Sequence, residues 1–316
     1  IGLVGSEMCI RDSFYYLHKN YSISSHPEIT LEANPDDLTP DYIAMLRTLP
    51  FNRLSMGIQT FNESILKVLQ RRHTARQAIE AFQNCRAAGF QNISIDLMYG
   101  LPGETLSTWQ QDLDQALLLH PEHLSAYHLI YEEDTVLWKL REQHKVEEAD
   151  EDLSVSLFST LIDRLTSEGY DHYEISNFSL PGLYSRHNSS YWTEKKYLGC
   201  GPSAHSYNGV SRQWNVASLD TYIKGISAGT PVFEIEELDL YTRYNDFVIT
   251  RIRTEWGMPL SKLRDEFGEK LYDYCLRMAA PHLKQGTLEL VNDILKLTRK
   301  GIFISDGIMS DMLWTD

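Results

Sequence analysis

The stretch NISIDLMYGLPGET, residues 92–105, places a carboxylate inside a segment that is otherwise suited to burial. A run of Ile, Leu, Met and Tyr residues is interrupted by Asp96 and ends in Gly-Leu-Pro-Gly, which is typical of a tight loop. Asp96 either caps the following turn or receives a ligand at the end of a sheet. The rest of the chain helps to choose between these interpretations.

Strand-like and helix-like segments alternate through the first half of the chain. This alternation predicts an α/β fold with a parallel sheet and right-handed crossovers, either doubly wound or barrel-like. The helical segments carry apolar residues at i, i+3, i+4 spacing and begin at capping residues, with Pro40 at a first helical position. The expected strands are residues 28–34, 53–59, 92–100 and 123–132, and the expected helical segments are residues 39–49, 62–89 and 105–119.

The second half follows a different pattern. An amphipathic helix is expected after residue 150 and stops at Gly169, and a loop-rich aromatic section follows to about residue 207. Two short β runs around Asn292 and Asp293 predict a hairpin followed by a helix, which is a winged-helix-like unit. Such units often bind DNA, but the acidic charge of the chain favours a packing role here.

The composition of the chain argues against several classes of protein function. The net charge of −15 argues against a nucleic-acid or anionic-membrane surface, and no stretch of about 18 apolar residues is present to span a bilayer. The cysteines Cys9, Cys85, Cys200 and Cys275 lie far apart without C-x-x-C spacing. This pattern predicts reduced thiols in a cytoplasmic protein, and it offers no metal cage.

Polar residues occur near the ends of the first three expected strands, at Glu32, Gln59 and Asp96. In parallel α/β folds the carboxyl ends of neighbouring strands converge on the ligand site. One such residue alone is usually a turn cap, but three at equivalent positions favour a binding role. Two carboxylates and an amide suit a ligand rich in hydroxyl and amino groups, such as a ribose joined to an amino-acid portion.

Four motifs resemble the radical S-adenosylmethionine family, specifically its HemN/HemW branch. They are EANPDD, NRLSMGIQTFNESILKVLQRRH, DLMYGLPGET and HLSAYHLIYEEDT, and the resemblance extends from about Phe14 to the C-terminus. It implies a partial TIM-like (β/α) barrel that lacks its first strands, followed by a C-terminal α+β region. By this resemblance, Glu32, Gln59, Arg71 and Asp96 match positions that contact S-adenosylmethionine. Arg71 is expected in the helix after the second strand, where it would otherwise be a solvated neighbour of Arg72.

The segment SRHNSSYW, residues 185–192, is similar to the heme-chaperone side of that branch. The resemblance implies heme binding, with His187 as an axial iron ligand and Asn188, Tyr191 and Trp192 beside the porphyrin. Alternatively, His187 and Asn188 hydrogen-bond a loop while Tyr191 and Trp192 fill a core. His205, in YLGCGPSAHSYNG, is a second candidate ligand for which a structural role is favoured.

The chain departs from the family where the [4Fe-4S] cluster is concerned. The family holds this cluster with C-x-x-x-C-x-x-C, and the four cysteines here cannot supply that spacing. We therefore expect no radical chemistry from the chain as it stands. The expected organisation is a non-native junction over residues 1–13, a partial barrel over 14–170, a loop-rich subdomain over 171–235 and a winged-helix-like domain over 236–316.

The resemblance implies a heme chaperone that, when complete, also holds a [4Fe-4S] cluster and S-adenosylmethionine. Its implied partners are heme and the apoproteins that receive it, and the resemblance also allows a homodimer and peripheral membrane association through partners. No nucleic-acid partner is expected. One alternative is an oxygen-independent coproporphyrinogen III oxidase, and another is an α/β fragment that binds no ligand.

Overall fold

A computed structural model describes residues 7–315. The chain divides into two compact units, which are described separately below. The N-terminal unit comprises residues 7–172 and 176–184, and the C-terminal unit comprises residues 173–175 and 185–315. Residues 1–6 of the predicted junction lie outside the described residues, whereas residues 7–13 are the first half of helix α1 (Glu7–Asn20). The predicted domain boundaries stay predictions.

A mixed sheet organises the N-terminal unit, and within residues 7–315 it has six strands in the order β1-β2-β3-β4-β6-β5. Strands β1 to β4 are parallel, as the alternation of segments predicted, and β6 joins β4 in the antiparallel direction. The strands are β1 (Thr30–Ala33), β2 (Arg53–Gln59), β3 (Ile93–Tyr99), β4 (His123–His128), β5 (Asp171–Glu174) and β6 (Asn177–Ser179).

Helices α2, α3 and α5 begin where the sequence predicted. Thr39, Asn62 and Thr105 accept hydrogen bonds from the first turns of α2, α3 and α5, and Gly89 has the positive φ expected beyond a helix end. No described helix is long and apolar enough to cross a membrane. The bounds are η1 (Pro35–Asp37), α2 (Pro40–Leu46), α3 (Glu63–Val68), α4 (Ala75–Ala87), α5 (Leu106–Leu119), α6 (Val136–Glu142) and α7 (Glu151–Ser167).

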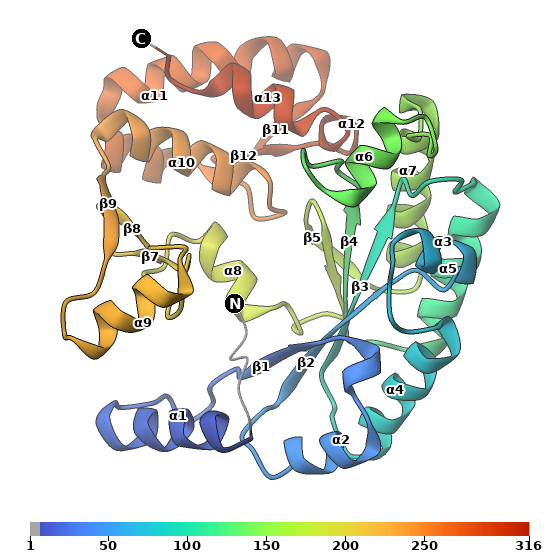
Figure 1. The fold of residues 1–316 in the computed structure, drawn as a ribbon. Coiled ribbons are helices and arrows are strands. Elements are labelled where there is room, and N and C mark those ends of the chain that lie inside the picture. Colours follow the sequence, from blue (N-terminus) through green and yellow to red (C-terminus); the bar gives the residue numbers. More distant parts are fainter. Residues whose placement is uncertain (1–6, 316) are drawn as a thin grey trace. The chain divides into compact units, whose positions relative to one another are not determined.

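The two faces of the sheet have opposite character. Helices α2, α4, α5 and α7 follow one another along one face (Figure 1). The alternate strand residues Leu54, Met56, Ile58, Ile93 and Ile95 are fully buried. The intervening positions are mostly polar. Parallel strands are usually apolar on both faces, so this second face requires a separate explanation.

The C-terminal unit contains two small antiparallel sheets. The first has the order β7-β8-β9 and is accompanied by the short helices α8 and α9 (Figure 1). The elements are α8 (Arg186–Trp192), β7 (His205–Tyr207), β8 (Ser211–Asn215), α9 (Leu219–Ser227) and β9 (Phe233–Glu237).

The last part of the chain folds around a hairpin between β11 and β12, as the sequence predicted. Asn292 and Asp293 form its turn with φ values of 49° and 70°, and these left-handed values suit a two-residue hairpin loop. Strand β10 pairs with β12, and the helices pack a continuous apolar core that includes Tyr244, Phe247 and Leu263. The bounds are α10 (Leu240–Ile252), β10 (Met258–Pro259), α11 (Leu260–Gln285), β11 (Leu288–Val291), β12 (Ile294–Leu297), α12 (Arg299–Ile302) and α13 (Ser305–Met312).

Close packing at Gly301 gives a test of this last core. A Cβ atom at Gly301 would lie 1.9 Å from the carbonyl oxygen of Thr287, whereas one at Gly307 would meet nothing within 4 Å. Gly301→Ala should therefore lower the free energy of unfolding of this unit by about 3 kcal/mol. Gly307→Ala, the matched control within a helix, should leave it equal or raise it by up to about 1 kcal/mol. Denaturant unfolding followed by tryptophan fluorescence measures both, and equal effects would contradict the packing described here.

Candidate cofactor-binding site

The polar face of the main sheet is built from side chains that are neighbours in register. Ser55 pairs with both Glu32 and Ser94, and Ser94 pairs with His123. The next row along the strands contains Gly57, Asp96, Ser125 and Asn177. Because register partners in a sheet point to the same side, these residues share one face. A sheet face with carboxylates and hydroxyls in two successive rows is suited to a polar ligand.

Three of the predicted ligand-binding residues converge on Gly57. A Cβ atom at Gly57 would lie 2.9 Å from Nε2 of Gln59 and 3.4 Å from an Nη atom of Arg71. Asp96 is the register partner of Gly57 on β3. Glu32 lies one row earlier on β1, close enough for its charge to act on Asp96. The absence of a side chain at Gly57 lets the side chains of Gln59 and Arg71 lie against the backbone there, and this group of residues is called the Gly57 cradle.

A bulge directs Gln59 into this group. The register between β2 and β3 shifts between Gly57 and Gln59, and Gln59 has a φ of 72°. Left-handed backbone is uncommon for a residue other than glycine, and bulges of this kind are over-represented next to active sites, where they redirect a side chain. The bulge thus brings an amide nitrogen back over Gly57.

Arg71 lies in a loop, so the prediction that it is helical was wrong. The expected helical segment 62–89 is divided into α3 and α4, because Gln70 has a left-handed φ of 54° and Thr74 starts a new capping box. In this loop the Arg71 guanidinium donates to Oδ1 of Asn34 and to the carbonyl oxygen of Gly57, both at 2.8 Å. The helix break is therefore what allows Arg71 to reach the sheet.

Asp96 lies in the middle of β3, so its predicted place at the strand tip was also wrong. The strand continues for three residues because Leu97 and Tyr99 are buried. Ser55 donates to Asp96 Oδ1 at 3.3 Å. Burial raises the pKa of Asp96 to about 6, hydrogen bonding from Ser125 opposes the rise, and the charge of Glu32 adds to it.

Two further carboxylates, which the sequence reasoning missed, fix the loops after β2 and β3. Glu104 accepts hydrogen bonds from the backbone N–H groups of Gly100 and Leu101, at 2.7 and 3.2 Å. Asp112, on α5, accepts hydrogen bonds from the Thr60 hydroxyl and from the N–H of Phe61. Burial raises the pKa of Glu104 to about 7. Both loops are thereby held beside the polar face.

Asn34, Ser55 and Ser125 were missed as well. A signal for the two serines exists in the sequence, since LSMGIQ and HLSAYH alternate polar or small residues with apolar ones. Asn34 offers no such local signal, because its contact with Arg71 joins residues that are 37 positions apart.

In the C-terminal unit, the structure brings His187 and Tyr191 together and places Trp192 elsewhere. The Tyr191 hydroxyl lies 3.0 Å from Nε2 of His187, one helical turn away, and both residues are exposed. The Tyr191 ring contacts the Tyr197 ring, with 4.9 Å between their centroids. The Tyr197 ring in turn contacts the Tyr207 ring, with 6.1 Å between their centroids. Trp192 instead packs against Arg253, whose guanidinium carbon lies 4.3 Å from the centroid of the Trp192 ring.

Asn188 is positioned by helix capping. Its backbone N–H donates to the side chain of Ser185, the N-cap of α8. Asn188 therefore lies in the first turn of the helix, one residue after His187.

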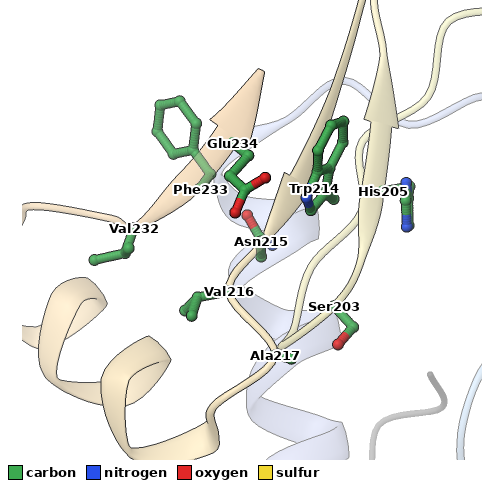
Figure 2. A pocket seen from close by; sticks show the side chains of 9 residues that line it. All are labelled: Ser203, His205, Trp214, Asn215, Val216, Ala217, Val232, Phe233 and Glu234. Atoms are coloured by element: carbon green, nitrogen blue, oxygen red, sulfur yellow. The ribbon is translucent and has the colours of Figure 1, made fainter. Parts of the chain in front are cut away.

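His205 borders a pocket of about 330 Å³ in the sheet β7-β8-β9 (Figure 2). Its ring stacks on Trp214 at a centroid distance of 5.9 Å. Figure 2 shows the other lining side chains, which come from β8, β9 and the adjoining segments: Ser203, Asn215, Val216, Ala217, Val232, Phe233 and Glu234. His205 has an aromatic support of its own and stays a second candidate ligand.

The described residues do not fit an iron–sulfur cluster. Cys85 and Cys275 are buried, whereas Cys9 and Cys200 are exposed. Among residues 7–315 no group of three His, Cys, Asp or Glu side chains is arranged to hold a metal ion.

Asp96 gives a test of the electrostatics of the polar face. The folded-state pKa of Asp96, about 6, lies above the ordinary value of 3.8 for an aspartate, so ionisation of Asp96 opposes folding. The contribution of Asp96 to stability therefore falls as pH rises from about 4 to 6. Asp96→Asn should thus raise the free energy of unfolding at pH 8 by about 3 kcal/mol and flatten its decline over that pH range. Denaturant unfolding across pH measures this, with the exposed Glu133→Gln as control. An unchanged pH profile in Asp96→Asn would contradict the burial of this charge.

Comparison with known proteins places this arrangement in a family. A family model described as the Radical SAM superfamily matches residues 1–116, and one described as the HemN C-terminal domain matches residues 238–304. The chain is 30% identical over 287 residues to the protein named heme chaperone HemW of Bacillus subtilis. The matched residues make up 90% of this chain and 76% of that protein. It is 32% identical over 292 residues to the HemW of Lactococcus lactis, with coverages of 92% and 76%.

A solved structure supports the same assignment at the level of the fold. Coproporphyrinogen III oxidase (HemN) from Escherichia coli superposes with a TM-score of 0.82 and covers 98% of this chain and 74% of that chain. At 22% identity this likeness concerns the fold alone. Together with the relatives above, it leads to one conclusion: the chain belongs to the radical SAM superfamily, in its HemN/HemW branch.

Proposed function

We propose that this protein is a heme chaperone of the HemW type, which binds heme in its C-terminal unit and S-adenosylmethionine on the polar face of its N-terminal sheet. The names of the relatives at 30 and 32% identity support the first part. The observation that carries the proposal is the exposed imidazole of His187 beside a row of aromatic rings.

The residues of α8 fit a heme. His187 is exposed and would supply the imidazole nitrogen that binds the iron. Its Nε2 atom is hydrogen-bonded to the Tyr191 hydroxyl, so iron binding through Nε2 requires that hydroxyl to move aside. The rings of Tyr191, Tyr197 and Tyr207 offer an apolar surface for a porphyrin, whereas Trp192 supports the helix by packing on Arg253.

The residues around Gly57 fit S-adenosylmethionine. Its ribose hydroxyls and ammonium group are hydrogen-bond donors, for which the carboxylates of Glu32 and Asp96 are suitable acceptors. The Gln59 amide and the Arg71 guanidinium would contact its acceptor atoms. Gly57 allows the Gln59 amide to lie over the sheet, because a Cβ atom there would come within 2.9 Å of Nε2 of Gln59 and displace it.

The wider assignment belongs to the same proposal. It includes transfer of heme to apoproteins in the cytoplasm, and homodimer formation or peripheral membrane association through partners. It also includes the partial barrel and the winged-helix-like form of the C-terminal elements. The order helix, strand, helices and hairpin from α10 to β12 supports the last of these.

A hemin titration tests the heme part. The wild-type chain should shift the Soret band to a position typical of histidine ligation, with saturation at one heme per chain. His187→Ala should lose this shift or weaken binding by about tenfold or more, because the axial ligand is removed. His18→Ala, which removes another exposed histidine on α1, is the control and should titrate like the wild type.

The same titration separates the two candidate ligands. His205→Ala should retain the Soret shift, since His205 is supported by Trp214 and is assigned no contact with iron. Loss of the shift in His205→Ala together with a normal His187→Ala would overturn the assignment of His187.

A further inference from the structure

The polar face has an additional row of side chains at the beginning of its strands. Thr30 and Arg53 are register partners on β1 and β2. Leu54 pairs with Ile93, so Asn92 is the corresponding neighbour of Arg53 at the start of β3. Side chains alternate along a strand, which places Arg53 on the same face as Ser55, two residues later. This row is named the Arg53 row: Thr30, Arg53 and Asn92.

Every member of the Arg53 row has a buried polar atom without a partner. These atoms are Oγ1 of Thr30, Nε of Arg53 and Oδ1 of Asn92, none of which makes a hydrogen bond with the described residues. Buried polar groups in folded proteins are nearly always hydrogen-bonded, and each orphan of this kind requires an explanation. Three orphans side by side across three strands point to a missing common partner.

The charge on Arg53 makes the requirement stronger. Arg53 is only 4% exposed, and it forms no ion pair with the described residues. Burying a guanidinium without a counter-ion is strongly unfavourable, whereas an oxyanion would form charge-assisted hydrogen bonds with it.

No neighbouring titratable group among residues 7–315 forms an ion pair with Arg53. His123 is fully buried, and burial together with Arg53 lowers its pKa well below the usual value, so its ring is neutral at pH 7. His123 also lies 2.8 Å from the Ser94 hydroxyl, which uses one of its ring nitrogens. Asp96 lies near enough for its pKa to be lowered by Arg53, but it makes no ion pair with it.

We propose that the Arg53 row binds a small oxyanion, a carboxylate or a phosphate, with the Arg53 guanidinium as its counter-ion. The Thr30 hydroxyl would donate to the anion, and Asn92 Oδ1 would accept from a hydroxyl or amino group that the anion carries. The backbone of Arg53 lies four residues before Gly57 on β2, about 13 Å along the strand, although the charge of Arg53 also acts on Asp96. The proposal does not depend on the heme or S-adenosylmethionine assignments.

Thermal unfolding of the whole chain at constant ionic strength tests the proposal. Replacing chloride by sodium phosphate or by sodium acetate should raise the wild-type midpoint in a saturable manner, by about 5 °C at roughly a hundredfold excess over the dissociation constant. A response to only one of the two salts identifies the anion as a phosphate or a carboxylate. If neither salt stabilises the wild type beyond chloride, the site does not exist.

Two substitutions assign any effect to the Arg53 row. Arg53→Met removes the buried charge and should abolish the response to the anion while unfolding no more easily than the wild type in chloride. Arg72→Gln is the control, because the Arg72 side chain is 67% exposed and paired with Asp36, and it should respond like the wild type. An Arg53→Met variant that still responds would overturn the proposal.

A milder variant covers the case in which Arg53→Met does not fold. Thr30→Val keeps the shape of the side chain and removes only the hydroxyl. Calorimetric titration with phosphate or acetate should show at least threefold weaker binding than the wild type. Equal affinity in Thr30→Val would exclude this row as the binding site.

Discussion

A carboxylate held in the middle of a buried parallel strand is the constraint around which the N-terminal unit is organised. Asp96 is kept there by hydroxyl groups on both neighbouring strands, Ser55 on β2 and Ser125 on β4. Its pKa of about 6 shows that these contacts only partly replace the water it has lost. An arrangement that opposes folding in this way is expected at functional sites, where residues are placed for ligand binding at the expense of stability.

The opposite face of the same sheet supplies the stability. Leu54, Met56 and Ile95 are fully buried against the layer of helices, and Trp109 on α5 is fully buried too. Because side chains alternate along a strand, the residues that hold the helices and the residues that form the candidate site lie on the same strands. The carboxylates of Glu104 and Asp112 then fix the loops at the ends of those strands. The site is therefore built on a rigid element with braced loops.

How much could be predicted from the sequence depended on whether the signal was local. The caps Thr39 and Thr105 and the hairpin turn at Asn292 are decided within a few residues, and they were predicted correctly. The loop position of Arg71 and the central position of Asp96 were not, since they follow from a left-handed residue at Gln70 and from the burial of Tyr99. Partners such as Asn34 require knowledge of register across the sheet, which no local pattern provides.

The C-terminal unit shows the same limit. The histidine and the tyrosine of HNSSYW meet because they are one helical turn apart, whereas Trp192 lies on another side of the helix against Arg253, some sixty residues later in the chain. An isolated β-bridge pairs Tyr197 with Tyr207, and the ring of Tyr197 in turn contacts that of Tyr191. A resemblance in sequence could thus nominate the motif, but the rings that surround it had to come from the structure.

The central claim is that the cradle at Gly57 holds S-adenosylmethionine, and calorimetric titration of this ligand into the wild-type chain and into Gly57→Ala tests it most directly. The added Cβ atom would meet Nε2 of Gln59 at 2.9 Å, so we predict saturable one-site binding to the wild type and at least tenfold weaker binding to Gly57→Ala, with both proteins folded. Equal binding to the two proteins, or no binding to the wild type, would contradict the account.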